Sequence, residues 1–102
     1  PEVSRRRLPA IALATEGFDG MSMHHVYILQ SIAAPDQFYT GLTDDLDRRI
    51  KEHNRGASPH SAKFAPWKLL SCHSFADRST AARFETYLKS GSGRAFARRH
   101  LR

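Results

Sequence analysis

The chain places a carboxylate within the apolar stripe of an expected helix. Residues 78–90 are predicted to form this helix, with Asp77 or Ser79 as its cap. Glu85 falls among the apolar positions, which are Ala81, Phe84 and Leu88. An unpaired buried carboxylate costs on the order of several kcal/mol, so it needs compensation. Two answers remain open: an ion pair with Arg49, or a bound cation such as Mg²⁺, which one or two carboxylates, water and substrate phosphate commonly hold.

A second expected helix also directs polar groups inward. Residues 44–55 should form it, because Thr43 is a good N-cap and Gly56 can end it. Arg49 and His53 fall one turn apart, on or beside its apolar stripe, which consists of Leu46 and Ile50. The pattern indicates that a guanidinium and an imidazole face the body of the protein.

Two tyrosines occupy central positions of two expected strands, residues 25–31 and 38–42. If these strands pair as a hairpin, Tyr27 and Tyr39 can point to the same face. They could equally be core residues with satisfied hydroxyls. Gly41 either allows the backbone to approach another group closely or marks a bulge.

The remaining segments complete a small α+β domain. After an irregular stretch or short helical turn, residues 67–75 are predicted to form a third strand. The helix that follows should stop at Gly91, and residues 93–102 should form a short basic helix. The order ββαβαα predicts a three-stranded, mainly antiparallel sheet covered by helices.

The first 22 residues look separate from the domain, which we place at residues 23–102. They begin with Pro, end in a segment with two Met residues, and show no sustained hydrophobic period. We interpret them as an extension or as sequence upstream of the true start. A short helix through Leu8, Ile11 and Leu13 is the structure they could form.

Charge is distributed unevenly along the chain. The formal net charge is +6 in 102 residues, but from Arg48 onward thirteen basic residues face three acids, a net of +10. This basic part favours a nucleic-acid partner over a membrane, although plain solubility is the simpler reading. Cys72 is the sole cysteine, which excludes a disulfide framework, and no apolar run reaches the length of a membrane span. We therefore expect a reducing, cytoplasmic location.

The separated polar positions also agree with a known pattern. Tyr39 follows Tyr27 by twelve residues, Arg49 follows Tyr39 by ten, and His53 follows by four more. The segments that carry them are HVYIL, FYTGLT and DDLDRRIKEHN, and the later segment FETYLKSG carries Glu85. Over residues 23–100 the chain resembles the GIY-YIG nuclease family, especially its small stand-alone bacterial members. Departures from the family's two triplets, at His25, Val26 and Thr40, remove none of these five groups.

The resemblance implies a nuclease that cleaves phosphodiester bonds with one divalent metal ion, Mg²⁺ or Mn²⁺, bound by Glu85. It implies that Tyr27 acts as, or assists, the general base beside the attacking water, and that Tyr39 positions phosphate or water. Arg49 would contact the scissile phosphate, and His53 would hydrogen-bond a tyrosine hydroxyl.

Basic side chains of the C-terminal part are expected to contact the nucleic-acid backbone without reading sequence. They are Lys63, Lys68, Lys89, Arg94, Arg98 and Arg99. We expect DNA rather than RNA as substrate, with cleavage directed by structure rather than sequence, in repair or processing. A non-catalytic nucleic-acid-binding module and a subunit of a repair complex are the alternatives. The sequence leaves a protein partner or a homodimer open.

Overall fold

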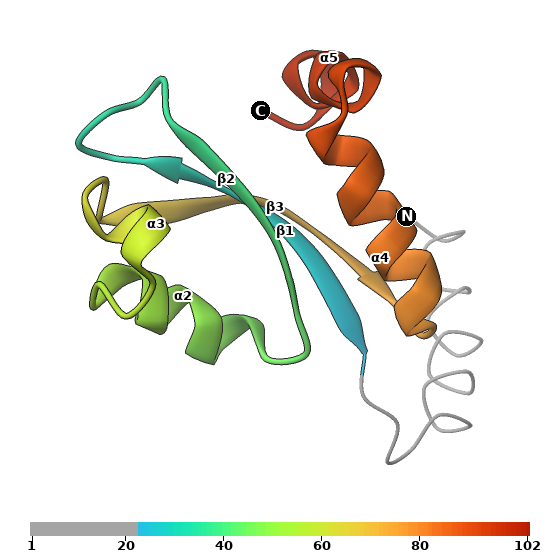
Figure 1. The fold of residues 1–102 in the computed structure, drawn as a ribbon, viewed down its shortest axis with the longest axis horizontal. Helices are drawn as coiled ribbons and strands as arrows, with labels where there is room; N and C mark the ends of the chain where they lie inside the picture. Colours follow the sequence, from blue (N-terminus) through green and yellow to red (C-terminus); the bar gives the residue numbers. More distant parts are fainter. Residues whose placement is uncertain (1–22) are drawn as a thin grey trace, which may run out of the picture.

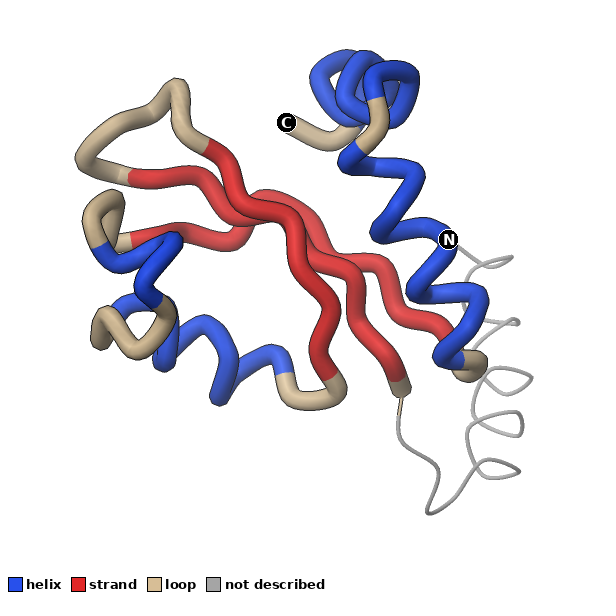
Figure 2. The backbone as a smooth tube through the Cα atoms, in the orientation of Figure 1, coloured by secondary structure: helices blue, strands red, loops and turns tan. Residues whose placement is uncertain are grey.

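A three-stranded antiparallel sheet forms the centre of the protein. The structure, a computed structural model, describes residues 23–102. Strand β1 (His24–Ser31) lies between β2 (Phe38–Thr43) and β3 (Trp67–Phe75), and it pairs antiparallel with both. The tube in Figure 2 shows how strongly the three strands twist together. The expected extension, and the helix through Leu8, Ile11 and Leu13, lie outside the described residues.

Two helical layers cover the sheet, one on each face (Figure 1). Helices α2 (Leu46–Asn54) and α3 (Pro59–Ala62) lie on one side, and α4 (Arg78–Lys89) and α5 (Gly91–His100) lie on the other. Alternation along β1 divides the core accordingly. Val26 and Ile28 pack with Ala81 and Leu88 of α4, whereas Tyr27 and Leu29 pack toward α2 and α3 with Trp67.

The fold class and the order of elements expected from the sequence are confirmed. Within residues 23–102, no helix is both long and apolar enough to span a membrane.

Several helix ends differ from the sequence-based expectation. Asp45, rather than Thr43, caps α2, because its side chain accepts the N–H of Arg48. Thr43 still ends strand β2, and its hydroxyl accepts the N–H of Asp45. Of the two expected caps of α4, Asp77 and Ser79, the structure shows Asp77.

Gly91 was the expected end of the α4 helix, but it is the first residue of α5. Ser90 serves both helices, because its hydroxyl donates to the Tyr87 carbonyl and accepts the N–H of Gly93. At Gly93 a Cβ would overlap the Tyr87 carbonyl, so glycine permits the tight turn between the two helices.

Gly41 is where strand β2 makes room for a tyrosine of β1. The register pairs Gly41 with Tyr27 and Tyr39 with Leu29, so both tyrosine side chains project from the face covered by α2 and α3. A Cβ built on Gly41 would lie 2.6 Å from Cζ of Tyr27 and would also overlap its hydroxyl oxygen. The expectation of a close approach at Gly41 is therefore confirmed.

We predict that Gly41→Ala lowers the free energy of unfolding by about 1–3 kcal/mol, the usual cost of overpacking a core. The Tyr27 ring would have to move, although it is buried and hydrogen-bonded to His53. Urea unfolding monitored by circular dichroism measures this. Gly91→Ala is the control, because a Cβ there meets no atom within 4 Å. Equal stability of the two variants would contradict the close-approach argument.

Candidate active site

A tyrosine and a histidine form a buried hydrogen-bonded pair beneath α2. Tyr27 is 1% exposed and His53 is completely buried. The Tyr27 hydroxyl oxygen lies 3.0 Å from Nε2 of His53. The sequence-based expectation that His53 faces the protein body is thus borne out, because the helix carries it to the centre of a packed layer.

A serine continues this pair on the far side of the imidazole. Ser61, in α3, is completely buried, and its hydroxyl lies 2.7 Å from Nδ1 of His53. The same hydroxyl donates to the carbonyl of Ser58 at 3.4 Å. A hydroxyl that donates to a carbonyl must accept from the imidazole, so we assign the proton of neutral His53 to Nδ1. Nε2 is then free to accept the proton of the Tyr27 hydroxyl.

Asn54 and Trp67 hold the elements that carry His53 and Ser61 against the sheet. The side chain of Asn54, next to His53, accepts the backbone N–H of Trp67 at 2.6 Å and donates to its carbonyl at 3.3 Å. The indole N–H of Trp67 donates to the Ser61 carbonyl at 2.9 Å. One residue of β3 therefore anchors both α2 and α3.

Tyr39 and Arg49 lie at the edge of the buried pair. The Tyr39 ring is 4.5 Å from the His53 ring and 6.2 Å from the Tyr27 ring, measured between centroids. The Arg49 side chain is 31% exposed, and its Nη1 lies 2.9 Å from Oε1 of Glu52. Glu52 raises the pKa of Arg49, and the hydroxyls of Tyr27 and Tyr39 add to this effect. Arg49 is therefore a permanent cation beside both tyrosines, with part of its surface open to solvent.

Burial controls the protonation of the pair. It raises the pKa of Tyr27 to about 12, against the lowering effect of the Arg49 guanidinium. Burial also lowers the pKa of His53, and the positive charge of Arg49 lowers it further. Both groups are consequently neutral near pH 7, with the tyrosine as hydrogen-bond donor and the imidazole as acceptor.

Glu85 approaches the site from the other helical layer. It lies on α4, and its negative charge contributes to the raised pKa of Tyr27. The Glu85 side chain is 22% exposed, and its Oε2 lies 3.0 Å from Nζ of Lys89. The alternative of an ion pair between Glu85 and Arg49 is wrong, because Glu52 lies one turn from Arg49 and pairs with it.

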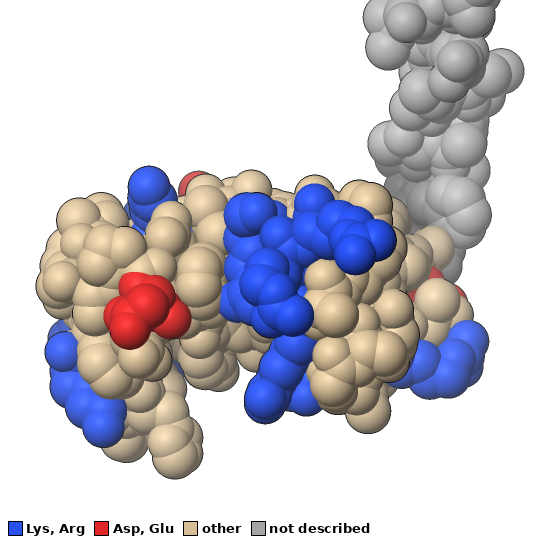
Figure 3. Space-filling view, turned by 90° about the horizontal axis from the view of Figure 1, so that it is seen from above, with Lys and Arg blue, Asp and Glu red and all other residues tan. Residues whose placement is uncertain are grey.

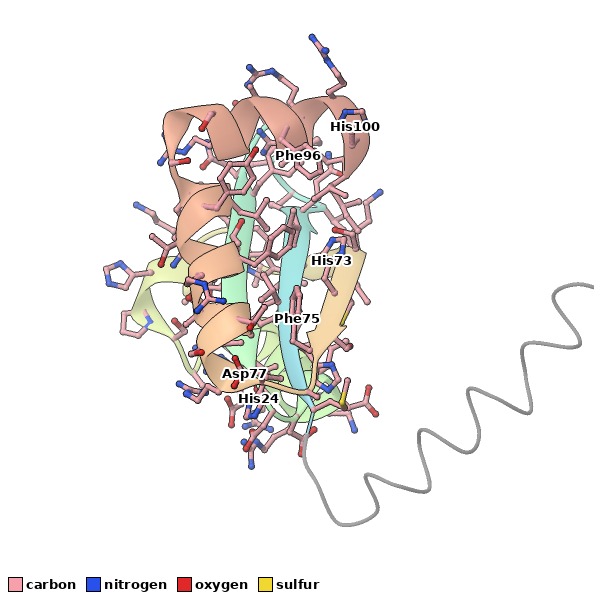
Figure 4. All side chains as sticks on the ribbon, turned by 90° about the vertical axis from the view of Figure 1, so that its right-hand side faces the viewer. His24, His73, Phe75, Asp77, Phe96 and His100 are labelled. Carbon is pink, nitrogen blue, oxygen red and sulfur yellow. The ribbon has the colours of Figure 1, made fainter. Side chains whose placement is uncertain are left out.

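Two other histidines of the described segment, His73 and His100, pack on phenylalanine rings. His73 packs on Phe84 with ring centroids 5.3 Å apart, and His100 packs on Phe96 at 4.9 Å. Figure 4 shows His73 on β3 and His100 on α5, well separated from each other. Among residues 23–102, no three His, Cys, Asp or Glu side chains gather in a way that could hold a metal ion by themselves.

Comparison with known proteins gives the family of the chain. Residues 23–99 match the family model described as the GIY-YIG catalytic domain. The chain belongs to the GIY-YIG family. The five polar groups at Tyr27, Tyr39, Arg49, His53 and Glu85 lie within the matched segment.

Individual relatives of this GIY-YIG protein cover parts of its length. A UPF0213 protein of Xanthomonas campestris pv. campestris (strain 8004) is 36% identical over 66 residues, which make up 64% of this chain and 63% of that protein. The structure-specific endonuclease subunit SLX1 of Meyerozyma guilliermondii is 37% identical over 81 residues, 74% of this chain and 28% of that protein. The solution NMR structure of a UPF0213 protein from Bacillus halodurans is 33% identical with a TM-score of 0.44, covering 72% of this chain and 79% of that chain. The chain thus matches less than two thirds of the first relative's length.

The basic residues expected to contact nucleic acid are spread over this GIY-YIG domain. Lys63 follows α3, where its Nζ lies 5.2 Å from the centroid of the Phe64 ring, and Lys68 lies on β3. Lys89 ends α4 beside Glu85, and Arg94, Arg98 and Arg99 lie on α5. The structure brings Lys89 and Arg94 together at one hollow, together with Arg102. Lys63 and Lys68 do not line that hollow.

Sequence reasoning missed three residues that support the site or lie near it. Glu52 stands three residues after Arg49, a helical spacing that could have identified it as the partner. Arg102 continues the spacing of four residues set by Arg94 and Arg98, which was a usable signal. Ser61 contacts His53 only because α3 folds back on α2, and no local pattern announces that contact.

The depressed pKa of His53 makes stability depend on pH. The unfolded chain has the usual histidine pKa of 6.5, whereas the folded protein has a lower one, so below about pH 6.5 the unfolded state binds more protons. The His53 contribution is therefore intact above pH 6.5 and declines as the pH falls toward the folded-state pKa. The slope is at most about 1.4 kcal/mol per pH unit for one proton.

Urea unfolding of wild type and His53→Gln between pH 8 and pH 5 tests this prediction. The difference in unfolding free energy between the two proteins should shrink as the pH falls below 6.5. His60→Gln is the matched control, since His60 is exposed, and the difference between it and wild type should stay constant. A pH-independent difference for His53→Gln would show that His53 does not titrate with the expected sign.

Proposed function

We propose that this protein is a metal-assisted endonuclease that hydrolyses phosphodiester bonds in DNA, with DNA structure rather than sequence directing cleavage. The observation that carries the proposal is the buried pair of Tyr27 and His53, bordered by the partly exposed cation of Arg49. Membership of the GIY-YIG family supports it, as does the likeness to a structure-specific endonuclease subunit. A role in DNA repair or processing and a cytoplasmic location belong to the same proposal.

Glu85 fits a metal ion that the substrate helps to hold. It is a single, partly exposed carboxylate whose present partner is a flexible, half-exposed lysine. Such a donor set suits Mg²⁺ or Mn²⁺ held by one carboxylate, water and substrate phosphate, and it does not suit a closed site made of protein ligands alone. When bound, one such ion would supply Lewis-acid stabilisation of charge on the phosphate oxygens. To bind the ion, the Glu85 carboxylate would have to break its ion pair with Lys89.

Arg49 is the phosphate-binding group of the proposed reaction. Glu52 accepts one hydrogen bond from its guanidinium, which orients the group, and the remaining N–H donors can reach a phosphate oxygen. Its positive charge does not depend on pH in the working range, so it can balance the charge that develops during attack. Tyr39, beside it, helps to position phosphate or water.

Tyr27 and His53 handle the proton of the attacking water. The Tyr27 hydroxyl donates to Nε2 of His53, and its oxygen can accept hydrogen bonds from the neighbouring Arg49 guanidinium and from the attacking water. Burial raises the pKa of Tyr27 to about 12 and lowers the pKa of His53, so transfer of the tyrosine proton to the imidazole is unfavourable in the free protein. Proton transfer along Tyr27 and His53 therefore accompanies attack, rather than preceding it, and requires His53 to be neutral.

A non-catalytic nucleic-acid-binding module is the second candidate. The basic side chains gathered at the hollow beside α5 favour it, since backbone contacts alone could explain them. The two candidates differ in one measurable way. A binding module would bind nucleic acid without cleaving it, and its affinity would not depend on Glu85. A protein partner or homodimer would be compatible with either function.

Cleavage assays separate the two candidates. With Mg²⁺ or Mn²⁺ and labelled single-stranded, duplex and branched DNAs, we expect wild type to cut at least one substrate. Arg49→Ala should lower the rate by about 10²–10³-fold, the usual effect of removing one group that stabilises transition-state charge. Glu85→Gln should abolish cleavage while binding of DNA is largely kept.

Arg78→Ala is the control for this assay, because Arg78 is an exposed cation at the start of α4 and should leave the rate unchanged. Cleavage that survives Glu85→Gln would rule out Glu85 as the metal ligand. Tight binding without cleavage by wild type would favour the module.

Tyr27→Phe tests the proton-transfer step with little change of shape. We expect the rate at saturating DNA to fall by about 10²–10⁴-fold, because general acid–base catalysis contributes that much. The free energy of unfolding should fall by about 1–3 kcal/mol, since Nε2 of His53 loses its partner. Tyr87→Phe, at an exposed position of α4, is the matched control. Equal rates for the two variants would refute a role for the Tyr27 hydroxyl.

A further inference from the structure

A hollow of about 450 Å³ lies between the edge strand β2 and the helices α4 and α5. Residues 36–40, from β2 and the loop before it, line the hollow on the strand side, and Lys89, Arg94 and Arg102 line it on the helix side. Its size is in the range of sites that bind small ligands. It opens on the face of the sheet opposite to α2, so it is not part of the buried pair of Tyr27 and His53.

Positive charge dominates this hollow. Within residues 23–102, neither Arg94 nor Arg102 forms an ion pair. Among the described residues that line the hollow, Asp36 alone is acidic. Partial burial lowers the pKa of Arg102, and the neighbouring charges of Arg98 and Arg94 lower it further. Figure 3 views the molecule from above Figure 1, and it shows lysine and arginine side chains gathered near the middle of the surface seen from there. Cations that lie close together without carboxylate partners create a positive potential that attracts an anionic ligand.

An aromatic surface accompanies the charge. The Arg102 guanidinium carbon lies 4.1 Å from the centroid of the Phe38 ring in a cation–π contact, and both residues line the hollow. Bases stack on both aromatic rings and guanidinium groups, but only when the base is unpaired and its face is accessible. Charge and stacking surface together favour a nucleotide over a simple anion.

Two lining residues, Tyr39 and Lys89, link the hollow to the candidate active site. Tyr39 lines the hollow and contacts the His53 ring on the other side of the strand edge. Lys89 lines the hollow and pairs with Glu85. A nucleic-acid strand whose scissile phosphate lies at Arg49 and Glu85 would therefore pass directly into it.

We propose that the hollow binds one unpaired nucleotide next to the scissile phosphate, with its phosphate at Arg94 and Arg102 and its base stacked on Phe38 and Arg102. The inference rests on the proposed nuclease function and deepens it. It identifies the substrate as DNA that presents a single-stranded segment beside the cleaved bond. Fully paired duplex cannot insert a base here, because its bases are stacked on one another.

Fluorescence anisotropy with a labelled eight-nucleotide oligothymidylate and a blunt duplex tests the inference. Working in EDTA separates binding from cleavage. We expect Arg94→Ala and Arg102→Ala each to weaken single-strand binding about fivefold or more and to reduce the salt slope by about 0.7 per lost phosphate contact. Phe38→Leu should weaken single-strand binding about tenfold through lost stacking while duplex binding is unchanged.

Arg78→Ala is the charge-matched control, since it removes one exposed cation at the far end of α4. An oligonucleotide without bases should bind wild type and Phe38→Leu equally. Equal single-strand affinities for Arg94→Ala, Arg102→Ala and Arg78→Ala would overturn the inference. So would losses of the same size for duplex and single strand, or no binding of the oligothymidylate by wild type.

The two proposals fail separately. If wild type cuts no DNA but the hollow variants still lose single-strand binding selectively, the hollow stands and the nuclease function fails. If wild type cuts DNA but the hollow variants bind single strands as Arg78→Ala does, the nuclease function stands and the hollow fails.

Discussion

The structure depends on a chain of buried hydrogen bonds from the central strand through α2 to α3. Tyr27, His53 and Ser61 are all nearly or completely buried. The His53 imidazole forms one hydrogen bond with the Tyr27 hydroxyl and another with the Ser61 hydroxyl. Because an unpaired buried polar group costs about 1–3 kcal/mol, none of the three can be changed without penalising its neighbours. This chain ties the helical layer to the sheet, and it also holds a hydroxyl beside the Arg49 cation. Stability and the proposed chemistry therefore use the same contacts.

The edge strand β2 joins the two halves of the proposed site. Gly41 leaves space for the Tyr27 ring on the face covered by α2, and Phe38 lines the hollow on the face covered by α4 and α5. Arg49 and Glu85 come from helices on opposite faces of the sheet. A phosphate held between them would sit at the strand edge, where solvent can reach it. The twisted edge of a small sheet thus provides an open site without a deep cavity.

Much of the fold was predictable from the sequence because its signals are local. The β-branched and aromatic run of β1, the Asp77 cap and the glycine that follows α2 at Gly56 are each signals carried by a few neighbouring residues. The errors were local as well. Thr43 and Asp45 are both acceptable caps, and the extent of strand β2 decided between them. At Ser90 one side chain serves two helices, so the stop signal at Gly91 became a start.

The sequence by itself determined the family and the order of elements. It also determined which strand or helix carries each of the five polar residues of the site, because spacing along an element decides which residues share a face. These residues are Tyr27, Tyr39, Arg49, His53 and Glu85. Only the tertiary structure decided their partners. It joined His53 to Ser61 and Tyr27, and it brought Arg102 over Phe38. Most of these contacts link segments distant along the chain. Their geometry depends on how the helices pack on the sheet, and no local pattern of residues encodes that packing.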